Sequence, residues 1–204
     1  MALPSFTSKI SSFEDLGVLQ TYGFRGEALN ALCKIADVTI ITKTDKDEVG
    51  RLYNMDNNGN IETSKLHPRQ KGTTVQIKQI FKNFPVRRKI ITNTKKTTQD
   101  IKLLEILLKS FGICNPTIRI HYRVNNDVVF IKPNLSSIKE ATEYVLGSKV
   151  MSDMKWITYE EAEATVQLMI PDKEIRDINE ICQANHRYIF VNNRPIKCKD
   201  IEKV

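Results

Sequence analysis

The stretch Thr21-Tyr22-Gly23-Phe24-Arg25-Gly26-Glu27-Ala28-Leu29 places two glycines directly before a helical pattern of apolar residues. Because Leu29 and Leu32 recur at the spacing of one helix face, the sequence predicts a helix that begins just after Gly26. Free N–H groups and the positive end of the helix dipole make such a start a ready phosphate site. Glycines let the backbone approach phosphate oxygens closely, since no Cβ stands in the way. The spacing alone is weak evidence, because most Gly-x-x-Gly pairs simply turn the chain and the ending of a Walker A sequence is absent.

The segments that follow this helix predict strands joined by hairpins. Residues 38–44 are rich in β-branched side chains, and Asp56-Asn57-Asn58-Gly59-Asn60 is a strong turn signal between strands at 51–56 and 61–66. Residues 73–80 alternate as a strand, while the short segment 81–89, which contains Pro85, predicts a loop or a short helical turn. This part of the chain therefore indicates an antiparallel sheet beside the first helix.

Further along the chain a long amphipathic helix is expected from about Thr97 to Phe111, with Gly112 as its C-terminal cap. Residues 117–124 and 128–132 predict another hairpin, and strands are expected at 155–159, 165–170 and 187–191. Ser137, with Glu140 three residues later, predicts a capping box that opens a helix ending at Gly147. Helices and hairpins are interspersed, so the fold class is α+β rather than a doubly wound parallel sheet. A composition shift near Asn134 predicts two domains, 1–134 and 135–204.

Composition excludes several classes of protein. With 204 residues, 41% hydrophobic and 27% charged, and only 8 Gly and 7 Pro, the chain is neither collagen-like nor disordered. No apolar run is long enough for a bilayer, and residues 1–10 are no secretory signal, so no membrane partner is expected. The four cysteines lack paired spacing and predict reduced thiols rather than a disulfide framework. Cys182 and His186 alone do not make a metal site, so no metal-binding residue is assigned.

Positive charge is concentrated in the middle of the chain. The net charge is +7, but residues 51–123 alone carry a balance of +11, while the segments before and after carry −2 each. Between Lys65 and Lys102 there are eleven cations and one acid, Asp100. Such a field favours contact with a phosphate backbone through counterion release, which is salt-sensitive and largely independent of base sequence. A solvated face that only keeps the protein soluble is the alternative explanation.

Four blocks of the sequence resemble motifs of the MutL-type DNA mismatch repair proteins. Thr7-Ser8-Lys9-Ile10 with the glycine stretch from Thr21 to Leu29 resembles the lid and third ATP-binding motif, and Lys71-Gly72-Thr73-Thr74-Val75 resembles the fourth. Residues 81–89 are similar to the segment that follows, and Phe190-Val191-Asn192-Asn193-Arg194-Pro195 to the signature of the second domain. The stretch from 81 to 154 is most similar to the postmeiotic-segregation branch of the eukaryotic MutL homologues.

The resemblance implies the fold of the GHKL ATPase superfamily, which includes gyrase, a heat-shock chaperone and histidine kinases. A mixed sheet with helices on one face would hold ATP, and residues 135–204 would begin a second domain similar to ribosomal protein S-five. Thr73 would lie near the adenine side of the nucleotide. The other nucleotide-binding residues implied are those of the lid and the glycine motif: Thr7, Ser8, Lys9, Gly23, Phe24, Arg25, Gly26, Glu27, Ala28 and Leu29.

The resemblance and the charge pattern together predict contact with DNA. Arg87, Arg88 and Lys89 lie at the centre of the basic stretch, and Arg194 lies in the second-domain signature that the family associates with DNA. Arginine suits this role because its planar guanidinium can contact a phosphate at two points. The alternative for Arg87 or Arg88 is a structural brace for a loop.

The sequence departs from the family pattern upstream of the lid. The first two family motifs, which supply the glutamate that activates water, the asparagine that holds Mg²⁺ and the aspartate that reads adenine, are missing. Phosphoryl transfer needs those groups. We therefore assign no catalytic residue, and we expect a fragment truncated at both ends whose parent binds ATP and hydrolyses it slowly.

The function implied is that of a nuclear mismatch repair subunit. It would act as an ATP-switched clamp that binds DNA, pairs with a second MutL homologue and couples a MutS-type recognition complex to downstream repair of DNA damage. Two alternatives remain at this point. One is another GHKL enzyme such as a topoisomerase subunit, and the other is a DNA-binding fragment without ATPase activity.

Overall fold

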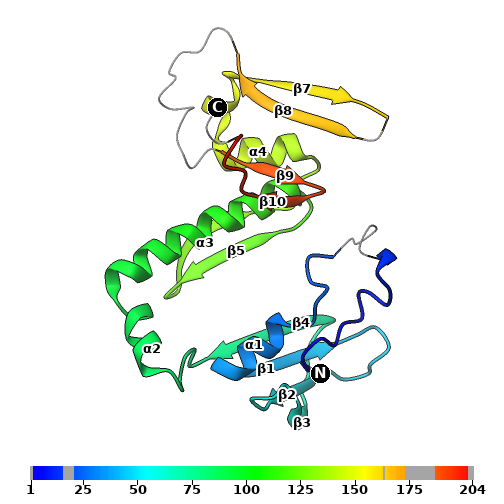
Figure 1. Cartoon of the computed structure of the whole chain (residues 1–204), viewed down its shortest axis with the longest axis vertical. Coiled ribbons are helices and arrows are strands. Elements are labelled where there is room, and N and C mark those ends of the chain that lie inside the picture. Colours follow the sequence, from blue (N-terminus) through cyan, green and yellow to red (C-terminus); the bar gives the residue numbers. More distant parts are fainter. Residues whose placement is uncertain (1, 16–20, 163, 173–186, 202–204) are drawn as a thin grey trace. The chain divides into compact units, whose positions relative to one another are not determined.

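The structure is a computed structural model of the 204-residue chain, and it describes residues 2–15, 21–162, 164–172 and 187–201. The chain forms two compact units, Met1–Thr97 and Thr98–Val204. These units do not coincide with the expected domain division at 134/135, which stays a prediction. Helices and antiparallel hairpins alternate along the chain, as Figure 1 shows, so the predicted α+β class is confirmed. No helix in the described ranges is both long and apolar enough to span a membrane.

The first unit is built on a four-stranded sheet with the order β3-β2-β1-β4. Its strands are β1 (Asp37–Lys43), β2 (Arg51–Met55), β3 (Ile61–Leu66) and β4 (Gly72–Lys78), and every neighbouring pair is antiparallel. The expected turn at 56–60 joins β2 to β3, with the Asp56 carboxylate accepting hydrogen bonds from the backbone N–H groups of Asn58 (2.9 Å) and Asn60 (2.8 Å). An Asp at the first turn position and a glycine with φ +85° at Gly59 explain why this hairpin was predictable.

Helix α1 (Ala28–Ile35) covers one face of this sheet (Figure 1). The two are joined by a small apolar core, whose buried members are Ala2, Cys33, Val38, Ile40 and Met55, with Leu29, Leu32 and Tyr53 packed against it. The opposite face carries a polar row, in which Asn54 on β2 accepts a hydrogen bond from Thr39 (2.9 Å) and donates one to Thr63 (2.8 Å). Side chains of a strand alternate between the two faces, so this contrast fixes which face packs against the helix.

Two further helices follow the sheet. Helix α2 (Pro85–Ile91) is the short helical turn expected after residue 81, with Pro85 at its first position, where a missing N–H is tolerated. Helix α3 (Thr94–Cys114) is longer than predicted at both ends, and the expected cap at Gly112 is wrong because this glycine lies inside the helix. A Cβ at Gly112 would lie 2.8 Å from Cδ of Lys132, so the glycine makes room for a side chain from another element.

After α3, the described residues of the second unit form three hairpins and two short helices. Strands β5 (Ile120–Val124) and β6 (Asp127–Lys132) pair, as do β7 (Met154–Glu160) with β8 (Thr165–Pro171) and β9 (Ile189–Val191) with β10 (Arg194–Ile196). Helix α4 (Ile138–Leu146) begins at the predicted Ser137 cap and ends at Gly147, whose φ is +88°, and α5 (Ser148–Met151) follows. The Ser137 side chain accepts a hydrogen bond from the Glu140 N–H, whereas the Glu140 carboxylate turns back to Ser136.

Lys132 is a fully buried cation at the end of β6. Its side chain is 0% exposed, and its Nζ donates to the backbone carbonyls of Pro116 (2.5 Å), Ile118 (2.8 Å) and Pro133 (3.0 Å). Burial lowers the pKa of Lys132 below its ordinary value, because the charged form loses its hydration. The Lys132 ammonium group therefore stabilises the fold, because it donates hydrogen bonds to backbone carbonyls of the turn that follows α3.

Candidate nucleotide site

The first turn of α1 has backbone N–H groups with no side-chain cap. Glu27 occupies the N-cap position in a helical conformation, its side chain makes no capping hydrogen bond, and no acidic residue lies in the first turn. The first N–H groups of a helix have no partner within the helix, and they carry its positive partial charge. This end of α1 is therefore suited to an anion.

Gly26 brings a second segment of the chain against this helix start. Its φ is +65°, and a Cβ at this position would lie 2.2 Å from the carbonyl oxygen of Phe6 and 2.9 Å from its backbone nitrogen. A glycine is thus required both by the left-handed conformation and by the close approach of the Phe6 backbone. The residues that follow Phe6 are held beside the glycine turn.

A hollow of about 580 Å³ lies between these two segments. It brings together all of the predicted lid and glycine-motif residues, which are Thr7, Ser8, Lys9, Gly23, Phe24, Arg25, Gly26, Glu27, Ala28 and Leu29. The Thr7 hydroxyl accepts a hydrogen bond from the Lys9 N–H (3.1 Å), and the Arg25 guanidinium lies 5.4 Å from the centre of the Phe24 ring. Two cations and a set of helix-start amides thus share one concave surface.

The remaining predicted nucleotide residue, Thr73, does not line this hollow. It lies on β4 opposite Thr42 of β1, and the two hydroxyl oxygens are 2.8 Å apart in a hydrogen bond. Conversely, Ala2, Phe6 and Tyr22 line the hollow but were not predicted. Tyr22 lies within the quoted glycine stretch. Nothing in the sequence indicated Ala2 and Phe6, because Ala2 is held there by Asn30 and Gly59, and Phe6 by its close approach to Gly26.

The predicted DNA-binding cations of the basic stretch lie on α2. Arg87, Arg88 and Lys89 are all exposed, and the Arg87 guanidinium lies 5.8 Å from the ring centres of both Phe81 and Phe84. Arg87 therefore has a packing role in addition to its charge. Arg194 begins β10 in the second unit, where it is half-buried and lies opposite Val191 of β9.

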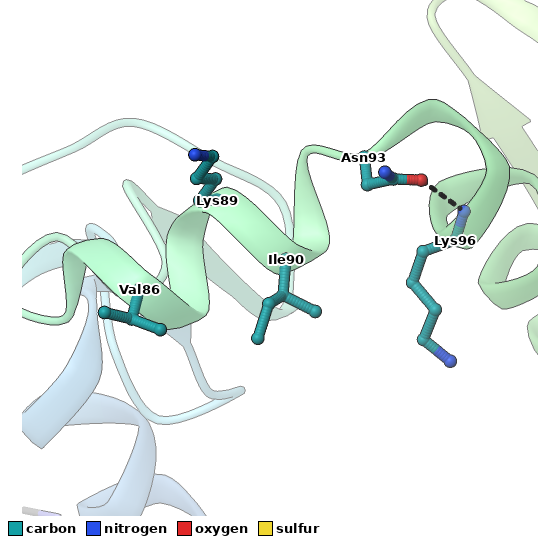
Figure 2. Close-up of a pocket in the computed structure, with 5 residues that line it drawn as sticks. All are labelled: Val86, Lys89, Ile90, Asn93 and Lys96. Carbon is teal, nitrogen blue, oxygen red and sulfur yellow. Dashed lines mark hydrogen bonds between the residues drawn. The ribbon is translucent and has the colours of Figure 1, made fainter.

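A shallow cavity of about 380 Å³ lies beside α2. Its lining residues, Val86, Lys89, Ile90, Asn93 and Lys96, are drawn in Figure 2. The Asn93 side chain accepts a hydrogen bond from the Lys96 N–H at 3.2 Å, which caps the start of α3 (Figure 2). The surface of this cavity is largely aliphatic carbon.

Three cations of the basic stretch have partners elsewhere in the first unit. Lys71 pairs with Asp45 and Lys82 with Asp37, each at 2.5 Å, and the Arg69 guanidinium donates to the Ile41 carbonyl and to Thr74. The acids that neutralise this stretch thus come from the strands and loops before it. The charge count alone overstated how much of the stretch is free for a ligand.

The described residues hold no group of three His, Cys, Asp or Glu side chains that could bind a metal ion. Cys182 and His186 lie outside the described residues. Of the side chains around the hollow that the structure describes, Glu27 is the one carboxylate. The residues present therefore do not fit a Mg²⁺ site by themselves, and we derive no step through that ion.

Comparison with solved structures identifies the fold class of the chain. No family model matches the chain. Among solved structures, the N-terminal domain of a DNA repair protein superimposes with a TM-score of 0.72 at 26% identity, over 100% of this chain and 65% of the other. The ATPase domain of Aquifex aeolicus MutL complexed with ADP gives a TM-score of 0.66 at 22% identity, over 95% of this chain and 69% of the other. The fold is that of the MutL ATPase domains of the GHKL superfamily.

Sequence comparison identifies the family within that class. Human PMS1 protein homolog 1 is 39% identical over 207 residues, which span the whole of this chain and 22% of the human protein. Mismatch repair endonuclease PMS2 of Gallus gallus is 43% identical over 122 residues (59% of this chain, 14% of the relative), and MutL of Thermotoga maritima is 29% identical over 98% of this chain and 38% of the relative. The chain belongs to the MutL family of DNA mismatch repair proteins and is most similar to its PMS branch. It spans about a fifth of the length of the human relative.

Proposed function

We propose that the hollow between residues 6–9 and the start of α1 binds the phosphates of ATP or ADP. The observation that carries this proposal is that two segments 13 or more residues apart in sequence, both matching family nucleotide motifs, meet around one concave surface. Uncapped amides at the helix start and the cations Lys9 and Arg25 supply positive potential there. The ADP complex of the Aquifex aeolicus MutL domain, which shares the fold, is consistent with such a ligand.

The chemistry that these residues supply is binding rather than hydrolysis. Amides and cations can hold and orient phosphate oxygens, whereas cleavage needs a general base for the attacking water and a bound Mg²⁺ that neutralises charge. We propose that the family's upstream motifs provide those two functions, and that Thr73 contributes on the adenine side. We also propose that residues 135–204 belong to the family's ribosomal-protein-S-five-like domain.

In the whole protein, we propose, ATP acts as a switch for a mismatch repair clamp in the nucleus. Nucleotide binding would favour one arrangement of the domains, and slow hydrolysis would reset it. The partners proposed are DNA, a second MutL homologue and a MutS-type mismatch recognition complex. The similarity to the PMS branch supports this role.

We propose that DNA contacts the protein through Arg87, Arg88 and Lys89 on α2, and through Arg194 on β10. The exposure of the three α2 cations, and the absence of acidic residues between 81 and 99, support this assignment. Phosphate contacts of this kind are independent of base sequence and weaken as salt rises.

Titration of the chain with ADP and with a non-hydrolysable ATP analogue, by calorimetry in the presence of Mg²⁺, tests the nucleotide proposal. Lys9→Ala is expected to weaken binding roughly threefold to tenfold, because an exposed cation contributes modestly to holding a phosphate. Lys34→Ala, which removes an exposed cation from the last turn of α1, away from the hollow, is the matched control and should leave the affinity unchanged. If neither nucleotide binds at millimolar concentration while DNA is still retained, the chain is a DNA-binding module without a nucleotide function.

A further inference from the structure

Asn30 is a buried polar residue in α1 that joins three segments of the first unit. Its side chain is 3% exposed, and Nδ2 donates one hydrogen bond to the Ala2 carbonyl and another to the Asn58 carbonyl, both 2.9 Å long. The Ala2 N–H in turn donates to the Gly59 carbonyl at 2.9 Å. The beginning of the chain is thus tied to both the helix and the β2–β3 turn.

The turn itself is shaped to accept this contact. Gly59 has φ +85°, and a Cβ there would lie 2.0 Å from the Ala2 carbonyl oxygen and 3.0 Å from Nδ2 of Asn30. No other residue type fits without moving the Ala2 backbone. Asparagine is equally specific at its own position, because its short side chain offers two N–H donors from one nitrogen, where serine offers one donor and leucine none.

The same segment is held a second time four residues later. Ala2 is 3% exposed at the first contact, and the Phe6 backbone lies against Gly26 at the second, while the Phe6 side chain is 71% exposed. Residues 2–6 are therefore fixed at both ends by backbone contacts. Thr7, Ser8 and Lys9 follow immediately and line the hollow.

We infer that Asn30 is a positioning residue, which holds the root of the Thr7–Lys9 segment in place so that these residues face the glycine turn. The expected effect on nucleotide binding rests on the proposed function: the phosphates of the nucleotide would meet a surface that is already formed. Without the Asn30 amide, the buried carbonyl of Ala2 and the partly exposed carbonyl of Asn58 lose the hydrogen bonds that this side chain donates, and we expect residues 2–9 to move away from α1 into water. Preformed contacts lower the ordering required when a ligand binds.

The contacts of Asn30 and Gly59 with the Ala2 backbone form an anchor for the start of the chain, and two variants disrupt it, one on each side of Ala2. Asn30→Leu removes the donors and keeps a side chain of similar size, whereas Gly59→Ala pushes the Ala2 carbonyl away. Gly147→Ala is the matched control for the second, because Gly147 has nearly the same φ (+88°) with nothing within 4 Å of its added Cβ. Ile41→Val is the control for the first, since Ile41 is buried on the opposite face of β1 from α1.

Limited trypsin cleavage after Lys9 is the primary measurement, made on the complete 204-residue chain alongside urea unfolding of each variant. Cleavage of a segment in fast opening equilibrium follows its local stability. We expect both anchor variants to be cut after Lys9 about tenfold faster than the original chain, beyond whatever change their global stability produces. Equal cleavage rates after Lys9 in the anchor variants and in the two controls would overturn the inference. If Asn30→Leu does not fold, Gly59→Ala decides the question.

Binding of ADP with Mg²⁺ is the second measurement and separates this inference from the proposed function. An affinity loss of about tenfold in the anchor variants, with the controls unchanged, is expected if both hold. If the original chain binds no ADP, the proposed nucleotide function fails, while the cleavage comparison still decides whether Asn30 positions the segment. If the anchor variants are cleaved faster but bind ADP as before, Asn30 does not act on the nucleotide and the inference is overturned.

Discussion

The hollow at α1 and the cationic helix α2 lie in the same unit, and both are proposed to meet phosphates, but by opposite means. At the hollow, backbone amides and a glycine with φ +65° make the surface, and the conformation of the chain determines it. On α2, exposed side chains carry the charge and the backbone has no special geometry. A Gly→Ala substitution, which adds one methyl group, is therefore expected to abolish the site at the hollow. On α2, substitutions of charge and changes in salt concentration are expected to alter phosphate binding without altering the fold.

The largest expected effect comes from Gly26→Ala. The left-handed conformation and the contact with the Phe6 carbonyl together should lower the free energy of unfolding of the first unit by about 3 kcal/mol. Nucleotide binding should be lost, because the Thr7–Lys9 segment moves away from the glycine turn. Urea unfolding and calorimetry measure the two effects, with Gly147→Ala as the control for a positive φ without a neighbour. Unchanged stability and binding would mean that the Phe6 approach is not part of the folded state.

Lys132→Met tests how much a buried cation contributes to stability, in contrast with the exposed cations of α2. Methionine keeps most of the aliphatic stem but removes the hydrogen bonds that Nζ donates to the carbonyls of Ile118 and Pro133, so we expect a loss of about 2 kcal/mol in the free energy of unfolding. DNA retention should not change, since the ammonium group is fully buried. Lys139→Met, at an exposed position on α4, is the control and should change stability by less than about 0.5 kcal/mol.

Charge reversal on α2 tests whether its exposed side chains contact DNA phosphates. Arg87→Glu with Arg88→Glu should weaken DNA retention at low salt about tenfold and reduce the salt slope by roughly 2, because two phosphate contacts are lost. Lys139→Glu with Lys155→Glu produces the same change in net charge at exposed positions outside the basic stretch, and should have a smaller effect. Retention and slope equal to those of the original chain would remove the DNA assignment from α2. Far-ultraviolet circular dichroism should show an unaltered fold in either case.

The smallest expected effect is a pH dependence that belongs to Lys132. Its pKa is lowered in the folded state, so between that pKa and the ordinary lysine value of 10.5 the unfolded chain binds more protons. The stability contributed by Lys132 should therefore rise as pH increases through this window. Subtracting the unfolding free energies of Lys132→Met from those of the original chain at several alkaline pH values isolates the effect. A difference that falls as pH rises would show that the carbonyl hydrogen bonds outweigh desolvation.

Local patterns in the sequence were sufficient for most elements of the fold. The turn at 56–60 and the Ser137 cap were predicted because their hydrogen bonds join residues two to four positions apart. Gly112 shows where this reasoning fails. Gly112 was predicted to end the helix. Instead its lack of a side chain makes room for Lys132, which lies 20 positions further along the chain and on another element.

The sequence by itself determined the family, the helix start after Gly26 and the concentration of positive charge, because motif spacing, apolar periodicity and composition are properties of neighbouring residues. Only the tertiary structure decided which polar groups are available. It placed Asn30 and Lys132 in the interior, paired Lys71 and Lys82 with acids from other segments, and brought Phe6 against Gly26. Burial and pairing depend on contacts between residues far apart in the chain, and no local pattern encodes them.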